Sequence, residues 1–246
     1  MESSTGEEGS HGHVHVHGHE HHRDVGGGPA RAAVFGVSDG LVSNVGLILG
    51  VAGASPGPGV VRVAGLAGLI AGAISMAAGE YNSMRVQAEL LERELEIERR
   101  ELKRNPAGEM NELAHLYQSR GVPADQAREL AQVMMRDPEL ALEVHAREEL
   151  GIDPNELGSP LGAAASSFSA FTVGAVVPLV PWFISAGNGA IIASLVLAVI
   201  AAVVVGTLTA RFTGRSLVRT VSRQVAFTLV PAAITFAIGS AIGASV

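Results

Sequence analysis

Five long apolar stretches alternate with polar segments along the chain. They lie at about 31–53, 60–82, 161–184, 190–210 and 224–245. As a helix, roughly 20 apolar residues span the hydrocarbon core of a bilayer. Residues 157–210 carry no charged side chain and are long enough for two spans, with a turn at residues 185–189. One such stretch also suits a buried helix of a soluble protein, but five indicate an all-α membrane protein with five transmembrane helices.

The polar segment at 85–157 predicts a helical insert between the second and third spans. Helix-forming residues continue from the second span to Arg104, so one long helix is expected to leave the membrane. Shorter helices are expected at about 107–119, 123–136 and 137–151, the last of them capped by Asp137. The transmembrane helices thus fall at 30–84 and 158–246, on either side of the insert.

The first 29 residues form a polar tail, and their composition is typical of a disordered segment. No apolar stretch typical of a secretory signal peptide occurs in it. Seven histidines lie in the tail, at His11, His13, His15, His17, His19, His21 and His22. Neutral imidazoles bind divalent transition metals, so the tail is either an accessory metal collector or a segment without a transport role.

The positive charges predict the orientation in the membrane. Arg and Lys residues precede the first span, follow the second span and fill the connection between the fourth and fifth. The opposite side carries only Arg62. Cytosolic loops are enriched in Arg and Lys, so the N-terminus and the insert are expected in the cytosol and the C-terminus outside or in a lumen.

Composition excludes several classes of function. The chain has no cysteine, which rules out disulfide scaffolds, iron–sulfur clusters and cysteine nucleophiles. Its net charge is −7, so no nucleic-acid partner is expected. It contains no phosphate-binding P-loop, no Gly-x-Ser-x-Gly and no His-Glu-x-x-His. These absences argue against an enzyme.

Two carboxylates, Asp39 and Glu80, lie within or at the edge of predicted spans. An ionisable group in a membrane is energetically costly, which favours a functional role for both. The alternatives are that Asp39 caps its helix or pairs with Arg31, and that Glu80 simply lies at the interface.

Helical spacing groups these carboxylates with other side chains. One stripe of the second span carries Gly68, Gly72, Met76 and Glu80, and one stripe of the first carries Asp39 and Ser43. A carboxylate beside a hydroxyl and a thioether suits a divalent transition metal in transit, because the soft sulfur discriminates against Ca²⁺ and Mg²⁺. Simple helix–helix packing at the glycines is the alternative.

The insert carries acidic residues at helical spacing, at Glu94, Glu98 and Glu101, at Glu109 and Glu112, and at Glu149 with His145. Such residues on several short helices can converge on a divalent cation. A solvated charged face stabilised by ion pairs such as Glu96–Arg100 fits the same spacing. Glu112 and His115 also form a single Glu-x-x-His, but a di-iron carboxylate bundle needs two.

Two sequence motifs resemble those of the vacuolar iron transporter family, which includes nodulin-like proteins. The segment FGVSDGLVSN at 35–44 is similar to the first-span signature of the family, and SMAAGEY at 75–81 to its second-span signature. The order of the remaining segments also matches, with a charged helical insert, a third span that contains Pro178 and Pro181, and two more spans.

This resemblance implies an all-helical homodimer that exports Fe²⁺, and often Mn²⁺, from the cytosol in exchange for protons. It implies that the insert gathers metal through Glu98, Glu101, Glu109, Glu112 and Glu149, and that Asp39 and Met76 lie on the membrane path. Two positions depart from the family. His145 stands where many members have Met, and Gly68 where some have a further Glu.

The resulting hypothesis is that the acidic insert collects Fe²⁺ or Mn²⁺, which then crosses along Asp39, Ser43, Met76 and Glu80. No prosthetic group is expected, and Zn²⁺ is a further candidate ligand of the insert. One alternative is a membrane-anchored metal buffer or sensor without transport, and another is a structural membrane protein. The membrane is expected to be the plasma membrane in a prokaryote and the vacuolar membrane in a eukaryote.

Overall fold

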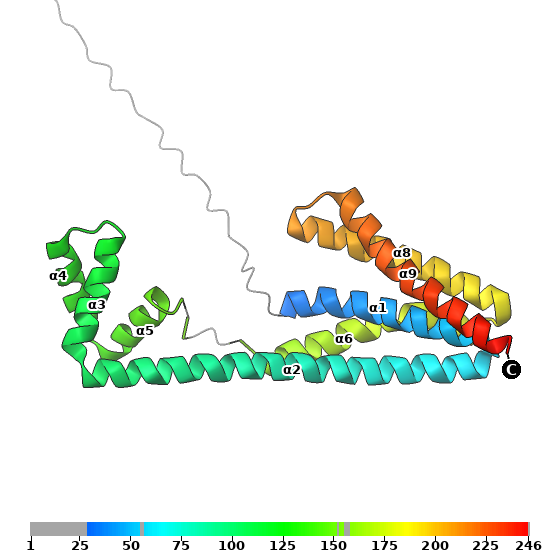
Figure 1. The fold of residues 1–246 in the computed structure, drawn as a ribbon, viewed down its shortest axis with the longest axis horizontal. Coiled ribbons are helices and arrows are strands. Elements are labelled where there is room, and N and C mark those ends of the chain that lie inside the picture. The colour runs from blue at the N-terminus through cyan, green and yellow to red at the C-terminus, as the bar shows by residue number, and fades with distance from the viewer. Residues whose placement is uncertain (1–28, 55–56, 152, 155–157, 246) are drawn as a thin grey trace, which may run out of the picture.

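The structure, a computed structural model, describes residues 29–54, 57–151, 153–154 and 158–245, and within them it contains helices and connections but no strand (Figure 1). The predicted histidine tail lies outside the described residues. The helices are α1 (Pro29–Ala54), α2 (Pro58–Arg104), α3 (Pro106–Ser119), α4 (Ala124–Met134), α5 (Pro138–Glu148), α6 (Pro160–Leu179), α7 (Pro181–Ile184), α8 (Gly187–Thr213) and α9 (Leu217–Gly243).

Five helices, α1, α2, α6, α8 and α9, are long and apolar enough to cross a membrane, which confirms the five predicted spans. Helix α2 continues without interruption for 47 residues, as expected from the lack of a stop signal after the second span. The third span differs from the expectation, because it ends at Leu179 and the short α7 follows from Pro181. Proline lacks the N–H that would continue the helix, which accounts for the break.

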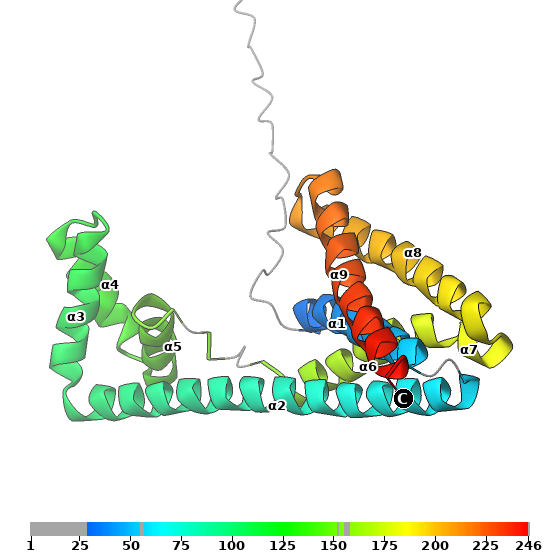
Figure 2. The same ribbon diagram turned by 45° about the vertical axis from the view of Figure 1, so that its right-hand side comes forward.

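Except for the end of α2, which continues into the insert, the ends of the five long helices lie at two opposite ends of the bundle (Figures 1 and 2). The starts of α1 and α6 and the turn between α8 and α9 are at the end that faces α3, α4 and α5. The end of α1, the start of α2 and the end of α9 are at the other end. The arginines of the α8–α9 connection therefore lie at the insert end. Arg62 lies at the far end, where its Nε donates a hydrogen bond of 2.6 Å to the Trp182 carbonyl.

Helix α1 runs through the centre of the bundle, in contact with α6 and α9. A Cβ atom at Gly40 would overlap the main-chain oxygen of Phe171 in α6, and one at Gly174 would overlap that of Val37. On the other side, a Cβ at Gly239 of α9 would overlap the Gly50 carbonyl. Lipid tails are as apolar as leucine, so helices in a membrane associate through such close approach rather than through hydrophobic burial.

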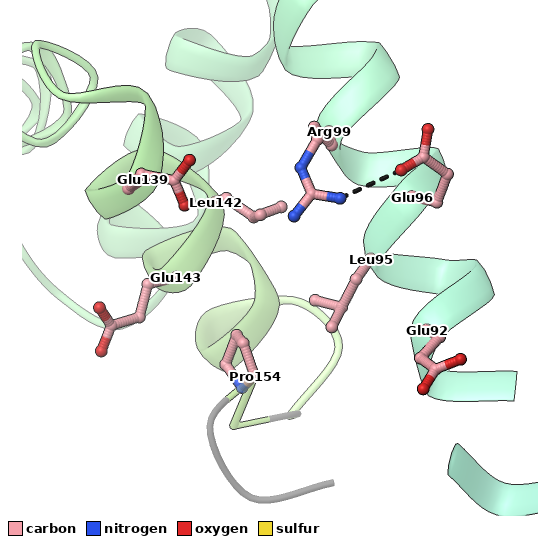
Figure 3. A pocket seen from close by; sticks show the side chains of 8 residues that line it. All are labelled: Glu92, Leu95, Glu96, Arg99, Glu139, Leu142, Glu143 and Pro154. Carbon is pink, nitrogen blue, oxygen red and sulfur yellow. Dashed lines mark hydrogen bonds and ion pairs between the residues drawn. The ribbon is translucent and has the colours of Figure 1, made fainter. Parts of the chain in front are cut away.

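The insert has two small apolar clusters. Leu95 of α2 packs against Leu142 and Ala146 of α5, and Figure 3 shows Leu95 and Leu142 pointing toward each other. The second cluster joins α3 and α4 through Leu113, Ala114 and Ala131, with Val144 of α5 at its edge. These contacts hold α5 on the extension of α2 and α3 on α4.

The caps of the insert helices follow the sequence. Asp137 accepts hydrogen bonds from the main-chain N–H groups of Glu139 and Leu140, at 2.9 and 3.3 Å, as predicted. Asn105 ends α2 and caps α3 by accepting from Gly108 N. A sharp corner between α2 and α3 results, which turns the chain back toward the face of α2 that carries Glu98.

Substitution of Gly40 by alanine tests the close packing of α1 on α6. The added methyl group has no room against the Phe171 backbone, so we expect Gly40→Ala to destabilise the fold by about 1–3 kcal/mol, as overpacking does in other cores. Thermal unfolding in detergent measures the effect. Gly59→Ala is the control, because a Cβ there meets nothing within 4 Å. Equal unfolding temperatures for both variants would contradict the packing argument.

Candidate metal centre

A cluster of acidic side chains surrounds His145 between α2, α3 and α5. The Nδ1 atom of His145 lies 3.2 Å from Glu98 Oε1, 3.9 Å from Glu109 Oε2 and 2.9 Å from Glu149 Oε1. His145 is fully buried, and Glu98 and Glu109 are 5% and 8% exposed. Three residues distant in sequence, Glu98, Glu109 and His145, each place one ligand atom within 4.8 Å of the others. The structure therefore brings together four of the six predicted insert ligands.

Hydrogen bonds do not account for this cluster. Among the described residues, both ring nitrogens of His145, Glu98 Oε1 and Glu149 Oε1 are buried without a hydrogen-bond partner. Buried polar atoms normally form hydrogen bonds, and several carboxylates that share one imidazole in a low-dielectric site are unfavourable when ionised. A divalent cation would supply the missing partner, because imidazole and carboxylate are ligands for borderline metals such as Fe²⁺, Mn²⁺ and Zn²⁺. The donor set thus fits a metal ion.

The electrostatics of the cluster point the same way. The pKa of Glu98 is raised to about 7, mainly by burial and further by the neighbouring glutamates, although His145 lowers it. Burial, and then the charges of nearby glutamates, raise the pKa of Glu149 to about 7. Burial also raises the pKa of Glu109. Without a cation, these carboxyl groups hold protons at a pH where ordinary glutamates are ionised.

Glu101 and Glu112, the other two predicted ligands, lie at the edge of the cluster. Both are exposed, yet their charges raise the pKa values of Glu109 and Glu149. They are close enough to add negative charge to the site. Glu94, one turn before Glu98 on α2, is exposed and outside the cluster. The sequence spacing alone does not separate Glu94 from Glu98, whereas the corner at Asn105 does, because it brings α3 over Glu98.

A separate hollow of about 640 Å³ lies beside this cluster, between α2 and α5 (Figure 3). Its rim carries the acidic side chains of Glu92, Glu96, Glu139 and Glu143, together with Arg99. Arg99 donates to Glu96 at 3.0 Å. None of the cluster residues lines this hollow, so it is distinct from the candidate metal centre.

Between the spans, a hollow of about 270 Å³ is lined by Asp39, Ser43, Gly68, Gly72, Ser75, Met76 and Phe171. Three of the four predicted path residues therefore line one space. Ser43 donates to the Asp39 carbonyl at 2.6 Å, which leaves its oxygen lone pairs available. Cβ atoms at Gly68 and Gly72 would overlap Leu47 and Phe171, so these glycines allow α2 to approach α1 and α6. Glu80, one turn beyond Met76, does not line the hollow.

Asn44 is a polar residue near this hollow that the sequence analysis did not identify. Its side chain is 2% exposed, and its Nδ2 donates to the Ala175 carbonyl at 2.6 Å. The Oδ1 atom is buried without a hydrogen-bond partner among the described residues, and a Cβ at Gly68 would lie 3.2 Å from it. In the sequence, the position of Asn44 directly after Ser43 was the feature that could have indicated it as a candidate.

Comparison with known proteins decides the family. Residues 30–240 match the VIT family. The chain belongs to the VIT family. It is 44% identical over 150 residues to a vacuolar iron transporter of Acanthamoeba castellanii, which covers 61% of this chain and 53% of that protein. It is 32% identical over 168 residues to vacuolar iron transporter 1 of Eucalyptus grandis, with 68% of each chain covered. The chain thus spans about half the length of the Acanthamoeba castellanii relative.

In this VIT-family chain, the match begins after the histidine tail and includes both the membrane hollow and the insert cluster. Vacuolar iron transporter 1 of Arabidopsis thaliana is a further relative, 30% identical over 168 residues, 68% of this chain and 67% of that protein. The family and the five apolar helices together identify an integral membrane protein.

The pKa values of Glu98 and Glu149 predict how metal binding by this VIT-family insert depends on pH. A metal needs ionised carboxylates, so protons compete with it below about pH 7. We expect the affinity for Mn²⁺ to fall roughly tenfold to a hundredfold between pH 7.5 and 6, as two protons rebind. Titration of the purified protein with Mn²⁺ measures this change. If the affinity for Mn²⁺ stayed the same between pH 7.5 and 6 and fell only near pH 4.5, the pKa values of Glu98 and Glu149 would not be raised.

Proposed function

We propose that this protein exports divalent iron, manganese or both from the cytosol in exchange for protons, for metal homeostasis and detoxification. The observation that carries the proposal is the cluster of Glu98, Glu109, His145 and Glu149, in which His145, Glu98 Oε1 and Glu149 Oε1 are buried without a hydrogen bond among the described residues. Its donors suit a divalent transition metal. Relatives named vacuolar iron transporters support iron as one substrate.

The insert captures the metal, and the membrane hollow moves it. Glu98 and Met76 lie on the same continuous helix, 22 residues apart, which corresponds to about 33 Å at 1.5 Å per residue. The metal would therefore bind at the two sites in separate steps. In the hollow, Asp39 offers a carboxylate and Met76 a thioether. A proton and a metal ion compete for the Asp39 carboxylate, so protonation from the acidic side releases the metal.

The ligand set suits Fe²⁺ and Mn²⁺ alike. Three or more carboxylates favour hard and borderline cations, and one imidazole adds affinity for Fe²⁺ and Zn²⁺. We propose that Zn²⁺ also binds the insert, where it competes with the transported ions. His145 in place of a softer thioether favours harder cations at this centre.

The hollow requires a second copy of the chain. Asp39 and Ser43 are exposed on the surface of one subunit, and an ionised carboxylate that faces lipid is costly. We propose that two subunits associate with these faces toward each other, which encloses the path in a homodimer. The N-terminus and the insert lie in the cytosol, the side that positive charges favour. The membrane is the plasma membrane in a prokaryotic cell and the vacuolar membrane in a eukaryotic one.

Proton-driven flux in proteoliposomes tests the transport proposal. With Fe²⁺ or Mn²⁺ on the insert side and an acidic opposite side, we expect metal uptake that depends on the pH gradient. Asp39→Asn keeps the size of the side chain but removes the charge, so its flux should fall at least about tenfold, a typical loss when a metal site is disrupted. Wild-type flux in a folded Asp39→Asn protein would contradict the proposed path.

The same assay separates capture from translocation. Glu98→Gln should raise the metal concentration needed for half-maximal flux, whereas Glu94→Gln, one turn away on the same helix and exposed, should leave it unchanged. Metal binding without flux in the wild type would favour the alternative, a membrane-anchored buffer or sensor. Failure to bind metal at the insert would favour a structural membrane protein.

The homodimer is tested by the mass of the purified protein in detergent. Light scattering, corrected for bound detergent, should give two copies of the 25.3 kDa chain. A single copy that still transports after reconstitution would exclude a path closed by a second subunit. Glu98→Gln serves as the control, because its change lies in the insert and leaves the faces with Asp39 unaltered.

A further inference from the structure

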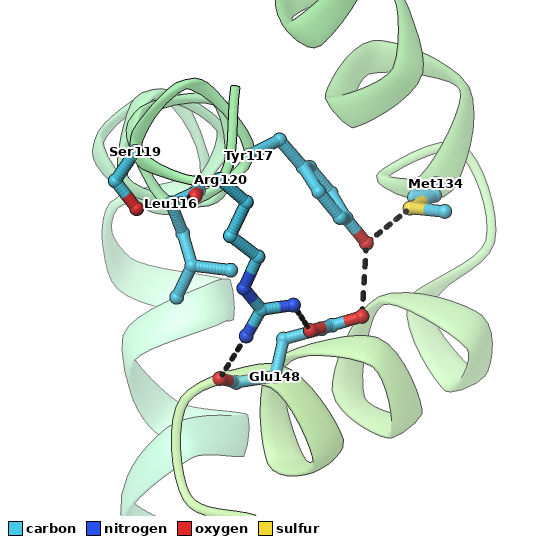
Figure 4. A network of polar contacts seen from close by, with 6 residues as sticks. All are labelled: Leu116, Tyr117, Ser119, Arg120, Met134 and Glu148. Atoms are coloured by element: carbon cyan, nitrogen blue, oxygen red, sulfur yellow. Dashed lines mark hydrogen bonds and ion pairs between the residues drawn. The ribbon is translucent and has the colours of Figure 1, made fainter. Parts of the chain in front are cut away.

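A second polar network lies next to the metal cluster and joins the far ends of α3 and α5 (Figure 4). Arg120, directly after α3, donates from Nη1 to the carboxylate of Glu148 and from Nη2 to the Glu148 main-chain oxygen at 3.3 Å. Tyr117 Oη lies 3.4 Å from the other carboxylate oxygen of Glu148 and 3.5 Å from Met134 Sδ in α4. Glu148 is thus held by its side chain and its backbone.

This network connects parts of the insert that apolar packing joins only weakly. Leu95, Leu142 and Ala146 fix α5 to α2. In the described part of the chain, the apolar core of α3 and α4 includes one side chain of α5, the partly buried Val144. The proposed metal ligands also belong to these separately packed parts of the insert. His145 and Glu149 belong to the end of α5, whereas Glu109 belongs to α3. A shift of α3 relative to α5 would separate them.

We propose that Arg120, Tyr117 and Glu148 form a clamp that holds the end of α5 against α3, which makes Arg120 a positioning residue for the metal site. Glu148 lies between His145 and Glu149 in sequence, so anchoring it restricts both ligands. This inference rests on the proposed metal binding by the insert. Outer partners that orient metal ligands commonly change affinity by 10- to 100-fold when they are removed.

The protonation of Tyr117 suits this role. Its pKa is raised by burial, and further by the charge of Glu148 and the hydrogen bond to it, while Arg120 lowers it. The phenol therefore keeps its proton and acts as a donor. The contact of Tyr117 with Glu148 therefore needs no change in the protonation of the phenol.

Arg120→Gln distinguishes positioning from simple electrostatics because the two predict opposite signs. Arg120 is a positive charge near a cation site, so Coulomb repulsion alone predicts tighter metal binding once it is removed. Positioning predicts weaker binding. Arg128→Gln is the matched control. It removes the same charge from an exposed position in α4 of the same insert, where no ion pair is present among the described residues.

The experiment measures Mn²⁺ binding to the full-length protein in detergent, from the loss of the free-ion signal in electron paramagnetic resonance. The temperature is chosen well below unfolding, which circular dichroism monitors for each variant. We expect Arg120→Gln and Glu148→Gln each to weaken binding about tenfold. The double variant should weaken it no further, because both changes break one contact. Arg128→Gln should bind as tightly as the wild type or slightly more tightly.

Other outcomes separate this inference from the proposed function. Wild-type or tighter binding by Arg120→Gln, or losses that add in the double variant, would overturn the clamp. A lower unfolding temperature with unchanged affinity would also overturn it, because Arg120 would then only stabilise the fold. Failure of the proposed metal site is recognised differently, since the wild type and Glu98→Gln would then bind Mn²⁺ equally.

Discussion

Helix α1 contacts α6 and α9 so closely that Gly40, Gly174 and Gly239 have no room for a Cβ atom. This backbone contact uses two sides of α1 and leaves the stripe with Asp39 and Ser43 facing outward. It also directs Asn44 to Ala175, where the amide is anchored. The residues of the proposed metal path are therefore positioned by small residues that are not themselves proposed to bind the metal. Larger side chains at these glycines would shift the position of Asp39 and Ser43 without altering their chemical groups.

In the insert, the corresponding constraint is electrostatic. Glu98 and Glu149 have pKa values of about 7, above the ordinary 4.5, because they are buried beside like charges. A carboxyl group with a raised pKa in the folded state favours folding when it is protonated. Without a metal, the contribution of Glu98 and Glu149 to the stability of the fold is therefore complete below about pH 4.5 and is lost as the pH rises through 7. A cation bound at the proposed site would reverse this trend, and metal binding would then be coupled to the folding of the insert.

The sequence predicted much of this arrangement because its signals are local. Charge-free stretches define the spans, and the absence of a breaker carries α2 to Arg104. The break before Pro181 and the short α8–α9 turn at Gly214 were not predicted, because they depend on how the helices pack. Spacing placed Glu94 and Glu98 on one stripe. Only the tertiary structure distinguishes Glu94 from Glu98. The contact between Arg120 and Glu148, which are 28 residues apart, likewise depends on the tertiary structure.

The separation of the two sites limits how the insert can act. Glu98 and Met76 are about 33 Å apart along one helix, so no ligand exchange passes a metal directly between them. In the proposed mechanism the insert would release the ion into water near the membrane, which requires an affinity for the ion that is not too high. Raised pKa values serve this end, because protons near neutral pH compete for Glu98 and Glu149. A site of fully ionised carboxylates would bind more tightly and release more slowly. The burial that raises these pKa values would thus also keep a metal in the proposed site exchangeable.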